Sequence, residues 1–201
     1  NVRIINKDAL KVDFKRLIAE HTHGLELSLN PGFKVVANLP YYITTPLLMH
    51  VLENNFKPNT MVVMVQDEVA RRMVSGPGKK DYGALSVAIQ FYTIPELVCK
   101  VSRHVFIPKP EVGSAVVKLT LRDSPPVPVD DPNTFFKIVR ASFGQRRKTL
   151  LNALAGSNLG LSKKSWEMVI KGANINPGVR GETLGLQEFA ALTVCYKKVA
   201  I

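Results

Sequence analysis

A run of five apolar residues, Met61-Val62-Val63-Met64-Val65, constrains the fold more than any other feature of the sequence. A continuous apolar run of this length is typical of a strand in a parallel sheet, which helices cover on both faces. A shorter β-branched run at 34–37 precedes it, and a helical pattern lies between the two. There Thr45 can act as the N-cap and Pro46 suits the first helical position. Strand, helix and strand in this order predict a doubly wound α/β arrangement.

The pattern continues to about residue 121. Helices are predicted at 66–73 and 82–92, and strands at 97–101 and 114–121. Between these last two strands, the prolines of 104–110 exclude ladder pairing in the middle of a sheet. We therefore expect an ordered loop beside the sheet.

A proline-rich segment at 124–132 reads as a linker, and no strand pattern follows it. Four helical patterns come after it, and Gly144, Gly156 and Gly172 are placed as C-terminal stops. The predicted helices cover 133–143, 146–155, 163–171 and 187–198. We predict two domains, an α/β domain over residues 1–123 and a small all-helical domain over residues 124–201.

Charge and cysteine content limit the class of partner. The 27 Lys and Arg residues against 16 Asp and Glu residues leave a net charge of +11, which makes a polyanion a candidate partner, with plain solubility as the alternative. The two cysteines stand far apart, and His21 and His23 lack a third ligand nearby, so neither a disulfide nor a metal is expected. No apolar run approaches the roughly 20 residues of a membrane span.

The candidate site is Asn38-Leu39-Pro40-Tyr41, directly after the strand at 34–37. Open α/β sheets bind ligands at the carboxyl ends of their strands. A side-chain amide oxygen and a nearby backbone carbonyl can accept both hydrogens of an exocyclic amine, and a tyrosine offers a face to a flat base. Such a pair turns the amine nitrogen toward sp3 geometry and needs no strong base. The pattern indicates methylation of a nucleobase amine, and an ordinary strand-to-helix turn is the alternative.

Six stretches together resemble the KsgA-type adenine dimethyltransferases that modify small-subunit ribosomal RNA, with the Gram-positive bacterial members the most similar. The QRRKTL stretch with its helical tail favours this branch over the methyltransferases of large-subunit RNA. The stretches are NLPYYITTPLL (38–48), VVMVQDEVARRM (62–73), YGALSVAIQFY (82–92), VFIPKPEVGSAVVKL (105–119), FFKIVRASFGQRRKTLLNAL (135–154) and RGETLGLQEFAAL (180–192).

The resemblance implies a Rossmann-like methyltransferase sheet and a cytoplasmic enzyme of ribosome biogenesis. Its activity would be transfer of methyl groups from S-adenosylmethionine to the 6-amino nitrogen of two adjacent adenines in the RNA of the 30S subunit. Three alternatives remain open. These are an RNA-binding ribosome-assembly factor with dispensable catalysis, a methyltransferase of large-subunit RNA, and a methyltransferase of adenine in DNA.

Residue roles follow from the same resemblance. Asn38 would accept a hydrogen bond from the target amine, and the carbonyl of Leu39 or Pro40 would be the second acceptor. Tyr41 would stack on the flipped adenine, and Phe106, in an F-x-P-x-P stretch, would close the other face of the base. For Phe106, a place in the hydrophobic core is the alternative.

Asp8 matches the family's acidic residue that accepts from the adenine of S-adenosylmethionine, and Asn38 would also contact this cofactor. Capping of a helix is the alternative for Asp8. The glycine-rich turn and the ribose-binding acid of such enzymes have no counterpart in the sequence, since Gly76-Pro77-Gly78 follows a helix and reads as a surface loop. We expect a chain that lacks about the first third of the catalytic domain, is silent on its own, binds the cofactor weakly and self-associates through an exposed sheet edge.

The last candidate is the basic tract Arg146-Arg147-Lys148, which follows Gln145. The pattern predicts that this tract opens a helix and contacts RNA phosphates. A solvated helix face is the alternative.

Overall fold

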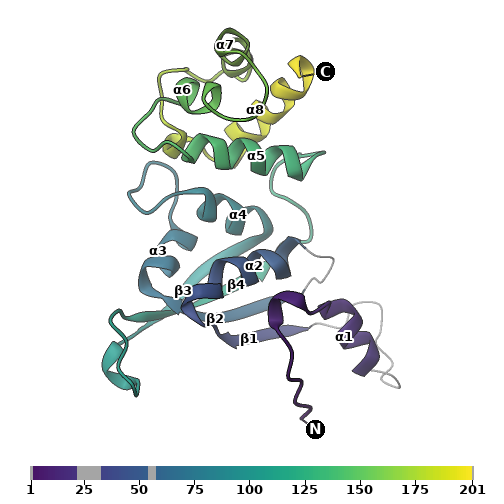
Figure 1. The fold of residues 1–201 in the computed structure, drawn as a ribbon, viewed down its shortest axis with the longest axis vertical. Coiled ribbons are helices and arrows are strands. Elements are labelled where there is room, and N and C mark those ends of the chain that lie inside the picture. The colour runs from purple at the N-terminus through teal and green to yellow at the C-terminus, as the bar shows by residue number, and fades with distance from the viewer. Residues whose placement is uncertain (1, 22–32, 54–57, 201) are drawn as a thin grey trace. The chain divides into compact units, whose positions relative to one another are not determined.

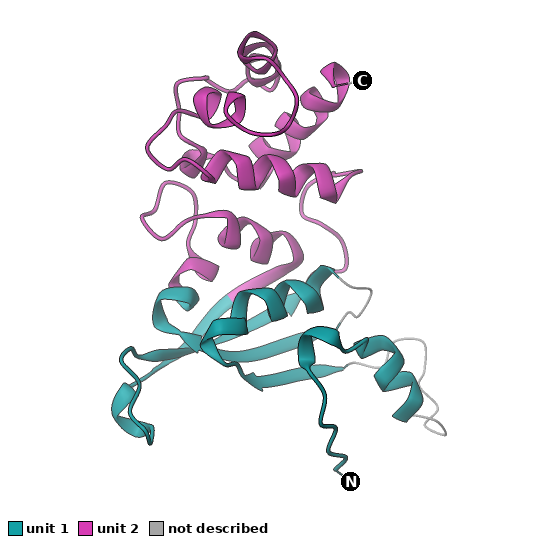
Figure 2. Ribbon diagram, viewed as in Figure 1, with its two compact units in different colours: residues 1–70, 96–121 teal, residues 71–95, 122–201 magenta. Residues whose placement is uncertain are grey.

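The computed structural model describes residues 2–21, 33–53 and 58–200. The chain divides into two compact units (Figure 2). Unit 1 comprises residues 1–70 and 96–121, and unit 2 comprises residues 71–95 and 122–201. The predicted domain boundary after residue 123 stays a prediction. His23 lies outside the described residues.

Unit 1 is built on a four-stranded sheet in the order β1-β2-β4-β3 (Figure 1). The strands are β1 (Lys34–Asn38), β2 (Thr60–Gln66), β3 (Thr93–Val101) and β4 (Ser114–Leu121). β1 pairs with β2 in parallel, and the helix α2 (Thr44–Glu53) lies between them in the chain. β2 pairs with β4 in antiparallel orientation. The predicted strand-helix-strand unit and the predicted α/β class are therefore confirmed.

Burial along β2 differs from the prediction. The continuous apolar run predicted a strand that is covered on both faces. Met61, Val63 and Val65 are at most 2% exposed, while Val62 and Met64 are half-buried. Successive side chains of a strand point to opposite faces, so one face of β2 lies in the core and the other is open in part.

The starts of α2 and β3 differ from prediction by two residues or more. α2 begins at Thr44, not after Thr45, because a 3-10 turn, η2 (Tyr41–Ile43), leads directly into it. β3 begins at Thr93, four residues before the predicted start. Pro95 lies within it, and the strand tolerates this proline because β3 is at the edge of the sheet.

Further short helices precede β4 in the chain. They are η1 (Ala9–Lys11), α1 (Phe14–His21), α3 (Asp67–Val74) and η3 (Arg103–Val105). η3 belongs to the loop between β3 and β4, which confirms the prediction of an ordered loop there. The Ile107–Pro108 peptide bond in this loop is cis.

Unit 2 is helical. Its elements are α4 (Ala84–Tyr92), α5 (Pro132–Phe143), α6 (Leu150–Ala155), α7 (Lys163–Gly172), η4 (Gly181–Thr183) and α8 (Leu186–Val199). α5 contacts α4, α6 and α8, and α7 contacts α6 and α8. Gly144 and Gly156 are C-caps as predicted. Gly172 is instead the last residue of α7, and two residues later Asn174 takes the left-handed conformation (φ 58°).

An aromatic cluster holds α4 against α5 and α8. The ring of Phe91 lies 5.1 Å from that of Phe135 and 5.2 Å from that of Phe136. Phe135 also lies 6.4 Å from Phe189 of α8. Aromatic pairs at these separations stabilise beyond the area they bury. The cluster explains why residues 71–95 group with the C-terminal helices rather than with the sheet that surrounds them in sequence.

We predict that Phe135→Ala lowers the free energy of unfolding by about 3–5 kcal/mol, because it leaves a cavity under three other rings. Phe135 is fully buried, whereas Met168, on α7, is 55% exposed. Urea denaturation followed by circular dichroism measures the effect, with Met168→Ala as the control. Equal losses in the two variants would contradict the role of the cluster.

Candidate functional site

A cavity of about 290 Å³ in unit 1 brings the predicted site residues together. The four residues of the turn at 38–41 and Phe106, which are far apart in the sequence, line it jointly. The complete lining is Asn38, Leu39, Pro40, Tyr41, Met64, Phe106, Pro108, Pro110 and Ser114. The sequence did not single out Met64 or Ser114. It identified Pro108 and Pro110 only as part of a loop.

The turn at 38–41 is held at the carboxyl end of β1. Asn38 is the last residue of β1 and is in register with Met64 of β2. The next residue, Leu39, is 6% exposed, and its backbone N–H donates to the Met64 carbonyl at 3.2 Å. Parallel pairing thus extends one residue past the strand and fixes where the turn begins.

The sequence left two candidates for the second acceptor, the carbonyls of Leu39 and Pro40. Their hydrogen bonds distinguish them. The Pro40 carbonyl accepts from Ile43 N at 3.1 Å and from Thr44 Oγ1 at 3.1 Å, so both of its lone pairs are used. Within the part of the chain that the structure describes, neither the Asn38 side chain nor the Leu39 carbonyl takes part in a hydrogen bond. The available acceptor pair is therefore Asn38 Oδ1 and Leu39 O.

The two aromatic residues of the cavity come from different segments. Tyr41 is 36% exposed, and its hydroxyl lies 2.8 Å from Ser114 Oγ at the start of β4. Phe106 lies in the loop between β3 and β4, whose ends are tied by a hydrogen bond from Arg103 Nη1 to the Glu111 carbonyl at 3.1 Å. Phe106 is half-buried and borders the cavity, so it is no core residue.

The lining of this cavity is electrically neutral, because it includes no acidic, basic or histidine side chain. Two aromatic rings, three prolines and a few neutral acceptors suit a flat, uncharged ligand with an amino group. Ligand pockets commonly combine apolar walls with a small number of placed polar groups.

Asp8 serves as an N-cap in the structure. Its Oδ1 accepts from Leu10 N at 3.1 Å, and its Oδ2 lies 3.8 Å from Lys11 Nζ. Asp8 does not line the cavity at 38–41. The capping alternative is thus observed, and the cofactor contact of Asp8 stays a prediction. A carboxylate offers about four acceptor positions, so the cap leaves capacity for a second partner.

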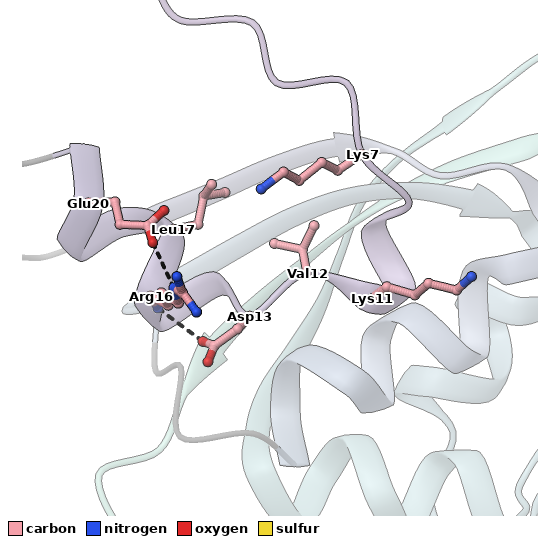
Figure 3. A pocket seen from close by; sticks show the side chains of 7 residues that line it. All are labelled: Lys7, Lys11, Val12, Asp13, Arg16, Leu17 and Glu20. Carbon is pink, nitrogen blue, oxygen red and sulfur yellow. Dashed lines mark hydrogen bonds and ion pairs between the residues drawn. The ribbon is translucent and has the colours of Figure 1, made fainter.

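A second cavity of about 360 Å³ in unit 1 lies between the N-terminal segment and α1 (Figure 3). It is lined by Lys7, Lys11, Val12, Asp13, Arg16, Leu17 and Glu20. Arg16 donates to Glu20 Oε1 at 2.7 Å, and this hydrogen bond holds the pKa of the Glu20 carboxyl below its usual value. Charges of both signs meet on an open surface here, which gives no preference for an anion or a cation.

The basic tract lies in a turn. The prediction that it opens a helix is therefore wrong. Lys148 N donates to the Gln145 carbonyl at 2.9 Å, and α6 starts only at Leu150, with Thr149 as its N-cap. Two bonds stabilise this start: the Thr149 hydroxyl accepts from Asn152 N at 3.4 Å, and Leu150 N donates to the Val179 carbonyl at 2.6 Å, which satisfies an orphan donor of the first turn.

Within unit 2 the three cations of the tract differ. Arg146 Nη2 donates to the Lys80 carbonyl at 3.0 Å, and its Nε lies 3.9 Å from Glu182 Oε2. Arg147 and Lys148 are exposed, and their side chains form no ion pair with any residue that the structure describes. Arg146 is thus anchored, whereas Arg147 and Lys148 are available to a partner.

The structure also locates the glycine pair of the sequence. Gly76 and Gly78 lie in the loop between α3 and α4, and Gly78 N donates to the Glu182 carbonyl at 2.8 Å. Across residues 2–21, 33–53 and 58–200, no three His, Cys, Asp or Glu side chains are grouped to hold a metal ion. None of the helices in these ranges is long and apolar enough to cross a membrane.

Comparison with protein families finds a match over residues 1–191 to the family described as ribosomal RNA adenine dimethylase. A protein of Moorella thermoacetica named ribosomal RNA small subunit methyltransferase A is 55% identical over 96% of this chain. One of the same name in Geobacillus thermodenitrificans is 50% identical over 96% of the chain. The chain spans 66% of the length of the first relative and 65% of the second.

Solved structures agree with this match. A dimethyladenosine transferase of Plasmodium falciparum superimposes with a TM-score of 0.73 at 25% identity, covering 84% of this chain and 68% of that one. The 23S rRNA methyltransferase ErmE superimposes with a TM-score of 0.58 at 22% identity, over 82% of this chain and 65% of the other. The second likeness concerns the fold alone.

Proposed function

The chain belongs to the ribosomal RNA adenine dimethylase family, and we propose that it carries the base-binding site of an enzyme that dimethylates adenine in small-subunit ribosomal RNA. The proposed reaction uses S-adenosylmethionine and acts on the 6-amino nitrogen of two adjacent adenines in the cytoplasm. The observation that supports it most directly is the acceptor pair of Asn38 and Leu39, which bonds to no residue that the structure describes, in a neutral cavity lined also by Tyr41 and Phe106.

The chemistry follows from the acceptors. When Asn38 Oδ1 and Leu39 O accept the two amine hydrogens, the nitrogen lone pair is withdrawn from the ring and directed away from both acceptors. S-adenosylmethionine supplies an electrophilic methyl group on a sulfonium sulfur. Transfer would join this methyl group to the amine nitrogen, release the sulfur as a thioether and leave the nitrogen to lose one proton to solvent, while Asn38 Oδ1 and Leu39 O would hold the amine in place. Rate enhancement would come from orientation of the base in a cavity lined by two rings rather than from a base catalyst.

The residues present fit the cofactor only in part. Asp8 keeps acceptor capacity beyond its bond to Leu10 N, which suits an adenine amino group. In the described residues, however, the Gly76–Gly78 pair is part of a loop bonded to Glu182, and no glycine-rich turn follows β1 or β2. We assign Asp8 and Asn38 to the cofactor and assign no other described residue to it.

The main alternative is an RNA-binding ribosome-assembly factor whose catalysis is dispensable. The exposed Arg147 and Lys148 support RNA binding under either function. For methylation of large-subunit RNA, the likeness to ErmE supports a shared fold and nothing about the substrate. A higher activity on duplex DNA than on small subunits would favour the DNA alternative.

We predict that Asn38→Ala lowers kcat for methylation by about 100-fold or more, since it removes one of two acceptors that orient the amine. The experiment uses a chimera that joins these 201 residues to the part of the M. thermoacetica relative that they do not cover. Unmethylated 30S subunits and labelled S-adenosylmethionine are the substrates, and mass spectrometry of the nucleosides detects dimethyladenosine. Asn158→Ala, at an exposed position of unit 2, is the matched control.

The outcomes separate the candidates. Abolished methylation with retained 30S binding supports the enzyme and the role of Asn38. Undiminished methylation in Asn38→Ala contradicts that role. A wild-type chimera that binds 30S subunits without methylating them favours the assembly factor.

Neutralising the basic tract tests its binding to RNA. Arg147→Gln with Lys148→Gln should reduce the slope of log affinity against log salt by about 0.7–0.9 for each phosphate that is no longer neutralised. Adding Arg146→Gln should change the slope little further, because Arg146 is held by Lys80 and Glu182. Lys163→Gln with Lys164→Gln, at the start of α7, is the control. An unchanged slope after the first pair assigns the tract to solubility.

We further propose that the 201-residue chain alone is catalytically silent and binds S-adenosylmethionine weakly. A ligand of this size needs burial on most sides, and Asp8 and Asn38 supply only isolated contacts. Each reduction of the binding free energy by about 1.4 kcal/mol weakens binding tenfold. Isothermal titration calorimetry should detect no micromolar affinity in the chain and a much tighter complex in the chimera. Micromolar binding by the chain alone contradicts this proposal.

A further inference from the structure

Ser114 is a buried polar residue that borders the candidate cavity. It is the first residue of β4, pairs with Gln66 of β2 and is 1% exposed. Its Oγ lies 2.8 Å from the Tyr41 hydroxyl, and either oxygen can donate. Buried hydroxyls are hydrogen-bonded in native proteins, so Tyr41 supplies a partner that Ser114 needs.

This hydrogen bond fixes the Tyr41 ring at its far end. The near end is set by the turn, in which Leu39 N bonds to the Met64 carbonyl and Ile43 N bonds to the Pro40 carbonyl. β1 and β4 both pair with β2, one on each side, so the contact spans from the end of β1 to the start of β4. With the backbone and the hydroxyl both held, the ring loses most of its rotational freedom.

The neighbouring tyrosine, Tyr42, provides a comparison within the same turn. Tyr42 has the same side chain and lies in the same 3-10 turn, but it is 84% exposed and does not line the cavity. Tyr41 is 36% exposed and lines it. A ring held in place before the ligand arrives avoids the cost of ordering a side chain on binding.

We propose that Ser114 is a positioning residue that fixes the Tyr41 ring plane for the adenine of the substrate. The inference rests on the proposed function, because it takes the cavity to be the adenine site. Ser114 acts through Tyr41 and touches neither the amine nor the methyl donor. Its effect falls on the alignment of the amine with Asn38 and Leu39, and hence on kcat more than on KM, since phosphate contacts elsewhere contribute most of the RNA affinity.

A double-mutant cycle in the chimera tests the tether. Tyr41→Phe removes one hydroxyl, Ser114→Ala removes the other, and both remove the same hydrogen bond. We expect each single variant to lower kcat about three- to tenfold with KM changed less than about twofold. The double variant should lose no more than either single variant, because the interaction is already gone.

Two further variants separate positioning from folding. Ser114→Thr keeps the hydroxyl that bonds to Tyr41, so its kcat should stay within about twofold of the unsubstituted chimera. Tyr42→Phe should leave kcat unchanged. Thermal denaturation of every variant is measured alongside. If Ser114→Ala fails to fold, Tyr41→Phe and Ser114→Thr carry the comparison.

The results distinguish this inference from the proposed function. Independent, multiplying losses in the double variant, or a full kcat in Tyr41→Phe, overturn the role of Ser114 while methylation by the unsubstituted chimera stands. A Ser114→Thr variant that is as impaired as Ser114→Ala at an unchanged melting temperature does the same. An unsubstituted chimera that cannot methylate 30S subunits overturns the proposed function and this inference with it.

Discussion

Parallel pairing of β1 with β2 is the constraint on which the candidate site depends. The ladder brings Asn38 beside Met64, and the bond from Leu39 N to the Met64 carbonyl carries the pairing one residue further. Beyond this point the chain must leave the sheet, and Pro40 and the 3-10 turn at 41–43 take it into α2. The Asn38 amide and the Leu39 carbonyl are therefore left at a strand end without internal partners among the described residues, which is where open α/β sheets bind ligands.

The antiparallel pairing of β4 completes the cavity. Because β4 runs opposite to β2, its first residue lies beside the carboxyl ends of β1 and β2. The loop that enters β4 consequently delivers Phe106, Pro108 and Pro110 to this edge. A reversal of strand direction thus collects three segments, distant in sequence, around one small volume. Ser114 lies where β4 begins and can reach Tyr41 for the same reason.

Local patterns predicted the parts of this arrangement that depend on local physics. The strand at 61–65 was located correctly and the turn at 38–41 to within one residue, since Asn38 is the last residue of β1; strand periodicity and turn chemistry are properties of neighbouring residues. Side-chain contacts across long separations leave no such signal. The Tyr41–Ser114 bond joins residues 73 apart, and the bond from Leu150 N to the Val179 carbonyl helps to stabilise the observed start of α6. Neither bond follows from the residues that flank it in the sequence.

The neutral lining of the cavity suits a protein in which one set of residues binds the base and another attracts the polyanion. For the proposed adenine substrate, a carboxylate near the amine would stabilise a cationic product, but it would also repel the phosphates on either side of the base and would have to be desolvated. Neutral acceptors avoid both costs and still accept the two hydrogens of an amine. Attraction to a polyanion then has to come from other residues, and the excess of 11 positive charges over the whole sequence provides it. Under the proposed function, substitutions in the cavity therefore alter chemistry and base selection, whereas substitutions of exposed cations alter the salt dependence of binding.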